Sequence, residues 1–192
     1  MAVAKGRLGE KTSGNLHDAF AGEAKAQIRL SAFAEKADEQ GYPQIATLFR
    51  AIAEAEKVHA ANHLRVLGEA IVRSTKENLA FSFQRETTIN EVTYPQLILE
   101  AEAEGERAAA QSFAYARDVE EGHARLYKKA MEHLLQEESI DYYVFAVCGY
   151  TSDGVLPDEC PICGARSELF TKVKQTARNA DQSIVPEGAG SG

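Results

Sequence analysis

Long apolar runs and an export signal are both missing from this 192-residue sequence. No stretch approaches the 18 consecutive apolar residues that mark a membrane-spanning helix. Residues 1–14 are polar and lack the apolar centre of a secretory signal. We therefore expect a cytoplasmic protein without a membrane partner.

Basic residues are in the minority, with 21 Lys and Arg against 29 Asp and Glu and a net charge of −8. This balance disfavours a nucleic acid or an anionic membrane as partner, because both carry negative charge. Hydrophobic residues make up 44% of the chain, which is enough for a real core in one or two domains.

Cysteine is absent from the first 147 residues and occurs three times after them, at Cys148, Cys160 and Cys163. An odd number of cysteines without an export signal argues against a disulfide framework, and their clustering favours a metal site. Cys160 and Cys163 form a Cys-x-x-Cys turn closed by Gly164, in which both sulfurs converge on one ion.

A matching turn is expected around Cys148, but its first position holds Phe145 instead of cysteine. A complete set of four cysteines would indicate tetrahedral iron or zinc. Three cysteines leave three alternatives. The first is a three-thiolate site for a third Fe or Zn, with water or another side chain as fourth ligand. The others are a module without metal and a substitution particular to this chain.

Carboxylates and imidazoles recur together in two copies of Glu-x-x-His, at Glu56 and His59 and again at Glu120 and His123. Residues three apart on a helix lie on one face, one turn from each other. Their oxygen and nitrogen donors suit a divalent transition metal such as iron, manganese or zinc. One copy alone would be weak evidence, because helices contain many glutamates.

Each copy has a further glutamate at a matching distance across a turn. Gly41 lies in a helix-stop segment, 18 residues after Glu23 and 18 before His59. In an antiparallel hairpin, both residues would then lie about 27 Å from the turn, at the same level.

The second hairpin repeats this arrangement around Gly105, which lies 18 residues before His123 and 19 after Glu86. An Asn-Leu pair precedes the first glutamate of each hairpin by eight residues. Two such hairpins supply the ligands of a di-metal centre in a ferritin-like four-helix bundle. The six ligands are Glu23, Glu56, His59, Glu86, Glu120 and His123. The alternative is a pair of amphipathic hairpins with solvated glutamates.

Apolar periodicity predicts a mainly α fold with helices at about 15–40, 42–66, 75–103 and 107–136. The link 67–74 is short for an irregular crossover, so part of it is helical or neighbouring chains exchange hairpins. A small, turn-rich β module follows, in which residues 142–145 favour a strand. The expected divisions are a flexible arm (1–14), the bundle (15–138), the module (139–173) and a disordered tail (174–192).

The third helix carries one residue more than the first between its glutamate and its turn. A single-turn π-bulge absorbs one residue and often occurs at functional sites. We place it between Glu86 and Pro95. Tyr94, on the same helix, is either a hydrogen-bond partner of the metal site or a core residue.

The combination of motifs resembles rubrerythrin over residues 15–173. The segments that carry the resemblance are 15–16, 21–23, 54–60, 94–95, 147–151 and 160–164. It implies a di-iron four-helix bundle followed by a rubredoxin-like domain. It also implies a homodimer that reduces hydrogen peroxide to water in oxidative-stress defence. The electrons would come from NAD(P)H through a reductase or rubredoxin.

Two positions depart from that family. Phe145 replaces a rubredoxin cysteine, and Ile89 replaces a carboxylate that usually stands three residues after the position of Glu86. A π-bulge could turn Glu91 inward to take over as a ligand. Without it, solvent would complete the six-ligand site.

The expected roles follow from the resemblance and the donor types. Glu56 and Glu120 bridge or flank the metals, Glu23 and Glu86 bind terminally, and His59 and His123 each cap one metal. Two alternatives come from other classes: a ferroxidase that handles iron with O2 as oxidant, and an electron-transfer or scaffold protein with zinc in the small module.

Overall fold

A computed structural model describes residues 8–68, 71–133 and 140–174 of the chain. Contacts divide the chain into two compact units, residues 1–78 and residues 79–192, and each is considered by itself. Within the described residues, no helix is long and apolar enough to cross a membrane.

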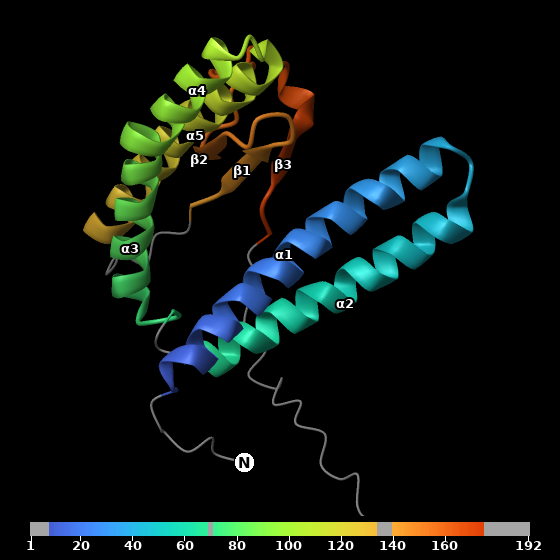
Figure 1. Cartoon of the computed structure of the whole chain (residues 1–192). Helices are drawn as coiled ribbons and strands as arrows, with labels where there is room; N and C mark the ends of the chain where they lie inside the picture. Colours follow the sequence, from blue (N-terminus) through green and yellow to red (C-terminus); the bar gives the residue numbers. More distant parts are fainter. Residues whose placement is uncertain (1–7, 69–70, 134–139, 175–192) are drawn as a thin grey trace, which may run out of the picture. The chain divides into compact units, whose positions relative to one another are not determined.

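The first unit is an antiparallel helical hairpin of α1 (Glu10–Glu39) and α2 (Pro43–Leu67) (Figure 1). The turn closes through two backbone bonds, in which Gly41 donates to Asp38 at 2.9 Å and Tyr42 donates to Ala37 at 2.8 Å. Gly41 has φ of 78°, a left-handed conformation that glycine adopts without steric cost. The predicted stop and turn at Gly41 are therefore confirmed.

The first helix begins earlier than the sequence predicts, which corrects the proposed arm at 1–14. Residues 10–14 are helical, and Ser13 donates a backbone bond to Gly9 at 2.9 Å. Glu10 lies in the first turn, where a carboxylate interacts favourably with the positive end of the helix dipole. Residues 1–7 lie outside the described residues.

Small side chains let the two helices of the hairpin approach closely. Ala34, Ala37 and Ala46 are fully or almost fully buried, and Phe49 packs against them. Phe49 also meets Phe33 edge-on, with 5.7 Å between ring centroids, a favourable aromatic geometry. This contact joins the two helices eight residues on either side of Gly41.

The second unit contains most of α3 (Thr75–Thr88), together with α4 (Tyr94–Ala103) and α5 (Arg107–Glu132). A π-helical segment, η2 (Ile89–Thr93), joins α3 to α4, so the predicted bulge between Glu86 and Pro95 is confirmed. The Asn90 side chain in η2 donates to the Arg117 carbonyl on α5 at 2.6 Å. The bulge is therefore tied to the facing helix, and α4 packs along α5 (Figure 1).

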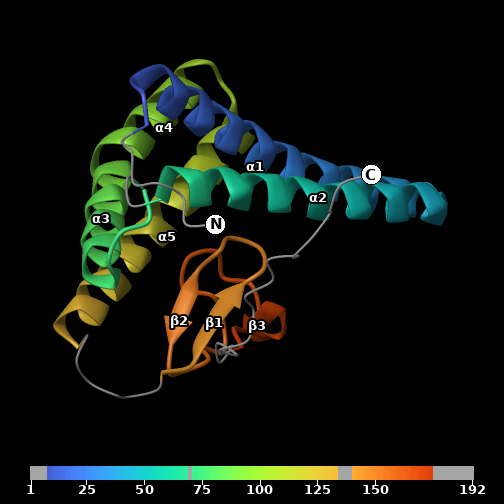
Figure 2. The same ribbon diagram turned by 90° about the horizontal axis from the view of Figure 1, so that it is seen from below.

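The module is a three-stranded antiparallel sheet in the order β2-β1-β3 (Figure 2). The strands are β1 (Tyr142–Phe145), β2 (Thr151–Asp153) and β3 (Phe170–Lys172), and a short 3-10 turn, η3 (Ser167–Leu169), precedes β3. The strand predicted at 142–145 is confirmed. The boundary predicted at 138/139 lies outside the described residues, and so does all of the tail predicted at 174–192 except residue 174.

Candidate metal centre

The first group of donors lies within the helical hairpin. Glu23 comes from α1, and Glu56 and His59 come from α2. One ligand atom of each lies within 4.8 Å of the other two. His59 Nδ1 lies 2.9 Å from Glu56 Oε2, as the i, i+3 spacing requires. The His59 side chain is 56% exposed, so this group is open on its imidazole side.

The second group lies in the other unit and repeats the same donors. Glu86 comes from α3, while Glu120 and His123 come from α5, and their ligand atoms again lie within 4.8 Å of one another. His123 Nδ1 lies 2.9 Å from Glu120 Oε2. The His123 side chain is only 28% exposed. Two carboxylates and one imidazole in each group fit Fe(II), Mn(II) or Zn(II).

The two carboxylates of the second group repel each other. Burial, together with the hydrogen bond and the charge of Glu120, raises the pKa of Glu86. Burial and the charges of Glu120 and Glu86 also raise the pKa of Tyr94. Without a cation, the site therefore holds like charges close together, and a divalent ion would relieve that repulsion.

This repulsion leads to a prediction for the metal-free protein. Glu86→Gln should raise its melting temperature at pH 7 by no more than about 2–4 °C, since solvent screens a partly exposed pair. The stability that neutral Glu86 contributes is complete below its unfolded-state pKa and is lost as pH rises through the raised folded-state pKa. The gain should therefore disappear near pH 4, about the pKa of an unperturbed Glu. Calorimetry at both pH values measures this, and an equal gain at pH 4 would contradict it.

Two further predicted residues have different surroundings. Tyr94 lies near Glu86 and Glu120, whose charges act on its pKa, and its ring lies 6.3 Å from that of Phe113. It therefore borders both the site and the packing between α4 and α5. Glu91 is exposed and is not part of the group of Glu86, Glu120 and His123. Its role as a replacement for the carboxylate missing at Ile89 remains a prediction.

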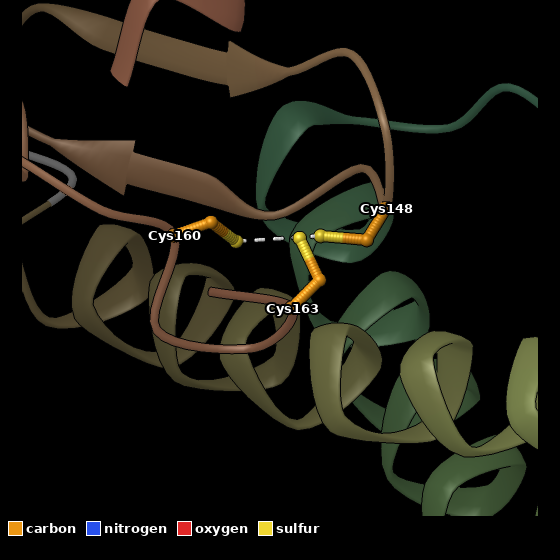
Figure 3. Close-up of side chains that lie close together, drawn as sticks. All are labelled: Cys148, Cys160 and Cys163. Carbon is orange, nitrogen blue, oxygen red and sulfur yellow. Dashed lines mark hydrogen bonds between the residues drawn. The ribbon is translucent and has the colours of Figure 1, made fainter. Parts of the chain in front are cut away.

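The three cysteines converge, although they come from two separate turns (Figure 3). Their sulfurs lie within 4.8 Å of one another, and Cys148 Sγ lies 3.4 Å from Cys160 Sγ, so both are free thiols. Burial raises the pKa of Cys148 to about 12. Burial also acts on Cys160, but hydrogen bonds from the Cys163 and Ile162 backbone outweigh it and lower the pKa of Cys160. The cluster is compatible with metal binding.

Phe145 occupies the backbone position that a fourth cysteine would have. Its N–H donates to the carbonyl five residues later at 2.9 Å, and its carbonyl accepts from Gly149 at 3.0 Å. Cys160 makes the same two bonds, at 2.8 Å to Ala165 and 2.8 Å from Gly164. The two turns are therefore equivalent, and Phe145 corresponds to Cys160.

The Phe145 ring is 1% exposed and packs on the Phe170 ring at 4.7 Å between centroids. It fills space in the module but offers no donor atom to a metal. The described residues therefore supply three thiolates and do not fit a four-thiolate iron site.

Thr151 contacts a histidine of the second donor group, although no role was predicted for it. Its hydroxyl lies 3.1 Å from His123 Nε2. A lone threonine has no ligand spacing or periodicity that would indicate such a contact.

Comparison with known families gives two matches along the chain. A family model described as Rubrerythrin matches residues 14–131. A second, described as Rubrerythrin, rubredoxin-like domain, matches residues 146–171 and so begins immediately after Phe145.

Curated relatives align over most of the chain. Rubrerythrin-2 of Clostridium acetobutylicum is 32% identical over 83% of this chain and 95% of its own length. Nigerythrin of Nitratidesulfovibrio vulgaris is 31% identical over 82% and 84%. Rubrerythrin of Porphyromonas gingivalis is 32% identical over 86% and 92%.

Solved structures of nigerythrin are similar in fold. The mixed-valence state has a TM-score of 0.51 and 32% identity, and the fully reduced, all-ferrous state has 0.52 and 31%. Each comparison covers 90% of this chain and 91% of the other. These matches confirm the expected fold class, which is a mainly α, ferritin-like four-helix fold followed by a small rubredoxin-like module.

Proposed function

The chain belongs to the rubrerythrin family, and on that premise we propose that it is a non-haem di-iron peroxidase that reduces hydrogen peroxide to water in oxidative-stress defence. Membership in this family supports the general class, an oxidoreductase of the di-iron, peroxidase type. The proposal adds hydrogen peroxide as the substrate and NAD(P)H as the source of electrons.

The observation that carries the proposal is the repeated donor set. Each unit brings two carboxylates and one imidazole within 4.8 Å, although the three residues come from two helices. The residues proposed to hold two iron ions are Glu23, Glu56, His59, Glu86, Glu120 and His123. When bound, two ferrous ions supply the two electrons that cleave an O–O bond without releasing a hydroxyl radical.

The protons for this reaction come from side chains and solvent. Reduction of one peroxide to two waters consumes two electrons and two protons. Tyr94 keeps its phenolic proton at neutral pH, since burial and the charges of Glu120 and Glu86 raise its pKa. Its hydroxyl is therefore proposed to donate a hydrogen bond at the site, and the carboxylates are proposed to pass protons from water.

The proposed partners follow from the same family. Electrons would come from NAD(P)H through a reductase or rubredoxin, and the chain would act as a homodimer, with hairpin exchange as one way to build it. The rubredoxin-like module is the relay that the family implies. Its three cysteines supply one thiolate fewer than the four-thiolate iron site through which such a relay passes electrons. A cytoplasmic location remains a prediction of the sequence.

One experiment tests the reaction directly. Metal-free protein is loaded with two Fe(II) per chain without oxygen and is then mixed with hydrogen peroxide or with O2. We expect two Fe(II) to be oxidised per peroxide consumed, and faster oxidation by peroxide than by an equal concentration of O2. Protein loaded with Zn(II), which has no redox chemistry, is the control and should consume no peroxide.

A ferroxidase is the second candidate, and the incomplete thiolate set favours it. A ferroxidase that handles iron with O2 uses the same six ligands and needs no relay in the module. Faster oxidation by O2 than by peroxide would replace the peroxidase proposal with this one. Failure to retain any Fe(II) would support an electron-transfer or scaffold role instead.

A further inference from the structure

His123 is held through both of its ring nitrogens. Nδ1 lies 2.9 Å from Glu120 Oε2, and Nε2 lies 3.1 Å from Thr151 Oγ1. The Thr151 hydroxyl is also within 3.3 Å of the Gly149 carbonyl, to which it donates. The hydroxyl has only one proton, so when it donates to Gly149 it must accept a hydrogen bond from His123.

This chain of hydrogen bonds sets the direction in which the imidazole points. Nδ1 lies beside Glu120, in the group with Glu86, and because a carboxylate oxygen only accepts, this contact needs a proton on Nδ1 when no cation is bound. A cation would take the place of that proton, and the remaining ring proton on Nε2 would then complete the bond to Thr151.

The sheet fixes the position of Thr151 independently of the helix. Thr151 lies in β2 and pairs with Val144 in β1. Asp153, two residues along the strand, projects to the same face and forms an ion pair with Lys129 on α5. Two side chains from one strand therefore contact the helix that carries His123.

Apolar side chains surround part of this bond. A pocket of about 440 Å³ beside it is lined by both partners, His123 and Thr151, and by largely apolar side chains that include Leu79, Leu126 and Tyr142. The partly enclosed position agrees with the lower exposure of His123, at 28%, than of His59, at 56%.

The histidine of the first donor group, His59, differs from His123 in its contacts. His59 has the same Nδ1 contact with its glutamate, at 2.9 Å. Among the described residues of its own unit, no side chain is hydrogen-bonded to its Nε2. The two Glu-x-x-His copies are alike in sequence, and Thr151 supplies such a partner to the second.

We propose that Thr151 is a positioning residue, through which the rubredoxin-like module fixes the orientation of His123 and strengthens cation binding by Glu86, Glu120 and His123. This inference rests on the metal-binding part of the proposed function and not on the reaction with peroxide. It gives the module a role that does not require a fourth cysteine. Partners that orient a metal-binding histidine in this way typically affect affinity by 10–100-fold.

The test compares two threonines in one sheet. Thr151 and Thr171 pair with Val144 from opposite sides, so Thr151→Val and Thr171→Val are matched replacements of a hydroxyl by a methyl group. Mn(II) is the probe, because it favours carboxylate and imidazole over thiolates. Electron paramagnetic resonance of free Mn(II) then gives the affinities of the full chain for this ion.

In Thr151→Val we expect roughly tenfold weaker binding at one of two Mn(II) sites and no change at the other. Thr171→Val should bind as the unaltered chain does, and Thr151→Ser, which restores the hydroxyl, should recover the affinity. In metal-free protein at pH 8, the nitrogen-15 NMR signal of His123 Nε2 should be the same in the unaltered chain, Thr151→Ser and Thr171→Val. It should shift in Thr151→Val, while the signals of His59 should not change.

Unchanged affinity and an unchanged His123 Nε2 signal in Thr151→Val would overturn the inference. Equal loss of affinity in Thr151→Val and Thr171→Val would also overturn it, because the effect would then be a general weakening of the sheet. Failure of the proposed function gives a different result. The unaltered chain would then bind no Mn(II), while the Nε2 signal of His123 would still report on Thr151.

Discussion

Glu120→Gln should reduce peroxide-dependent turnover by roughly 10²-fold or more and lower the iron content from about two to about one per chain. Residues that only orient a metal ligand typically account for 10–100-fold, so loss of a proposed ligand should cost at least that much. Glu120 Oε2 lies 2.9 Å from His123 Nδ1, and a ligand atom of Glu120 lies within 4.8 Å of one of Glu86. Replacement by a neutral amide removes a charged donor from the group without changing its volume.

The matched control is the neighbouring residue. Glu121 is exposed on the same helix and pairs with Arg125 one turn further on. Glu121→Gln changes the same net charge and should leave turnover and iron content within about twofold, since an exposed ion pair contributes little. Elemental analysis and peroxide assays measure both quantities. Normal iron content in Glu120→Gln would contradict the proposed ligand set.

Phe145→Cys should add about one iron per chain and produce the charge-transfer absorption of a ferric four-thiolate site. Residue 145 already has the backbone hydrogen bonds of Cys160, and its side chain is buried beside the sheet. A thiolate there would complete a four-thiolate set with Cys148, Cys160 and Cys163. Turnover coupled to an NAD(P)H-dependent reductase should rise, and iron held by the helices should not change.

The stability of this variant should depend on metal. Loss of the Phe145 ring removes its contact with Phe170 and leaves a cavity, which costs about 3–5 kcal/mol for Phe→Ala in a core. Binding of a structural metal contributes more than that, typically about 10–16 kcal/mol for zinc in small domains. Phe145→Cys should therefore melt below the unaltered protein without metal and above it with iron.

Phe145→Ala is the control, because it makes the cavity without adding a ligand. It should lose stability and gain no iron. If Phe145→Cys behaves like Phe145→Ala, the three thiols do not form part of a metal site. If iron is gained but reductase-coupled turnover does not rise, the missing thiolate is not what limits electron delivery.

Much of the helical architecture and the proposed ligand set could be predicted because both depend on local geometry. The turn at Gly41, the donors Glu23 and His59 and the π-helix before Pro95 follow from a fixed rise per residue and from residue counts across a turn. The same counts anticipated both donor groups. The start of α1 was predicted less well, because Glu10 and Gly9 permit a helix five residues earlier and no strong breaker stops it.

The donor types and their spacing along each helix can be read from the residues in order, and so can the missing cysteine at position 145. Where Phe145 packs, whether Glu91 is exposed and that Thr151 contacts His123 became evident only in the folded chain. These three outcomes depend on contacts between elements distant in sequence, such as α5 with β2 and β1 with β3. Such contacts leave no periodic pattern in the chain, because they are set by how the elements pack and not by the geometry of any one of them.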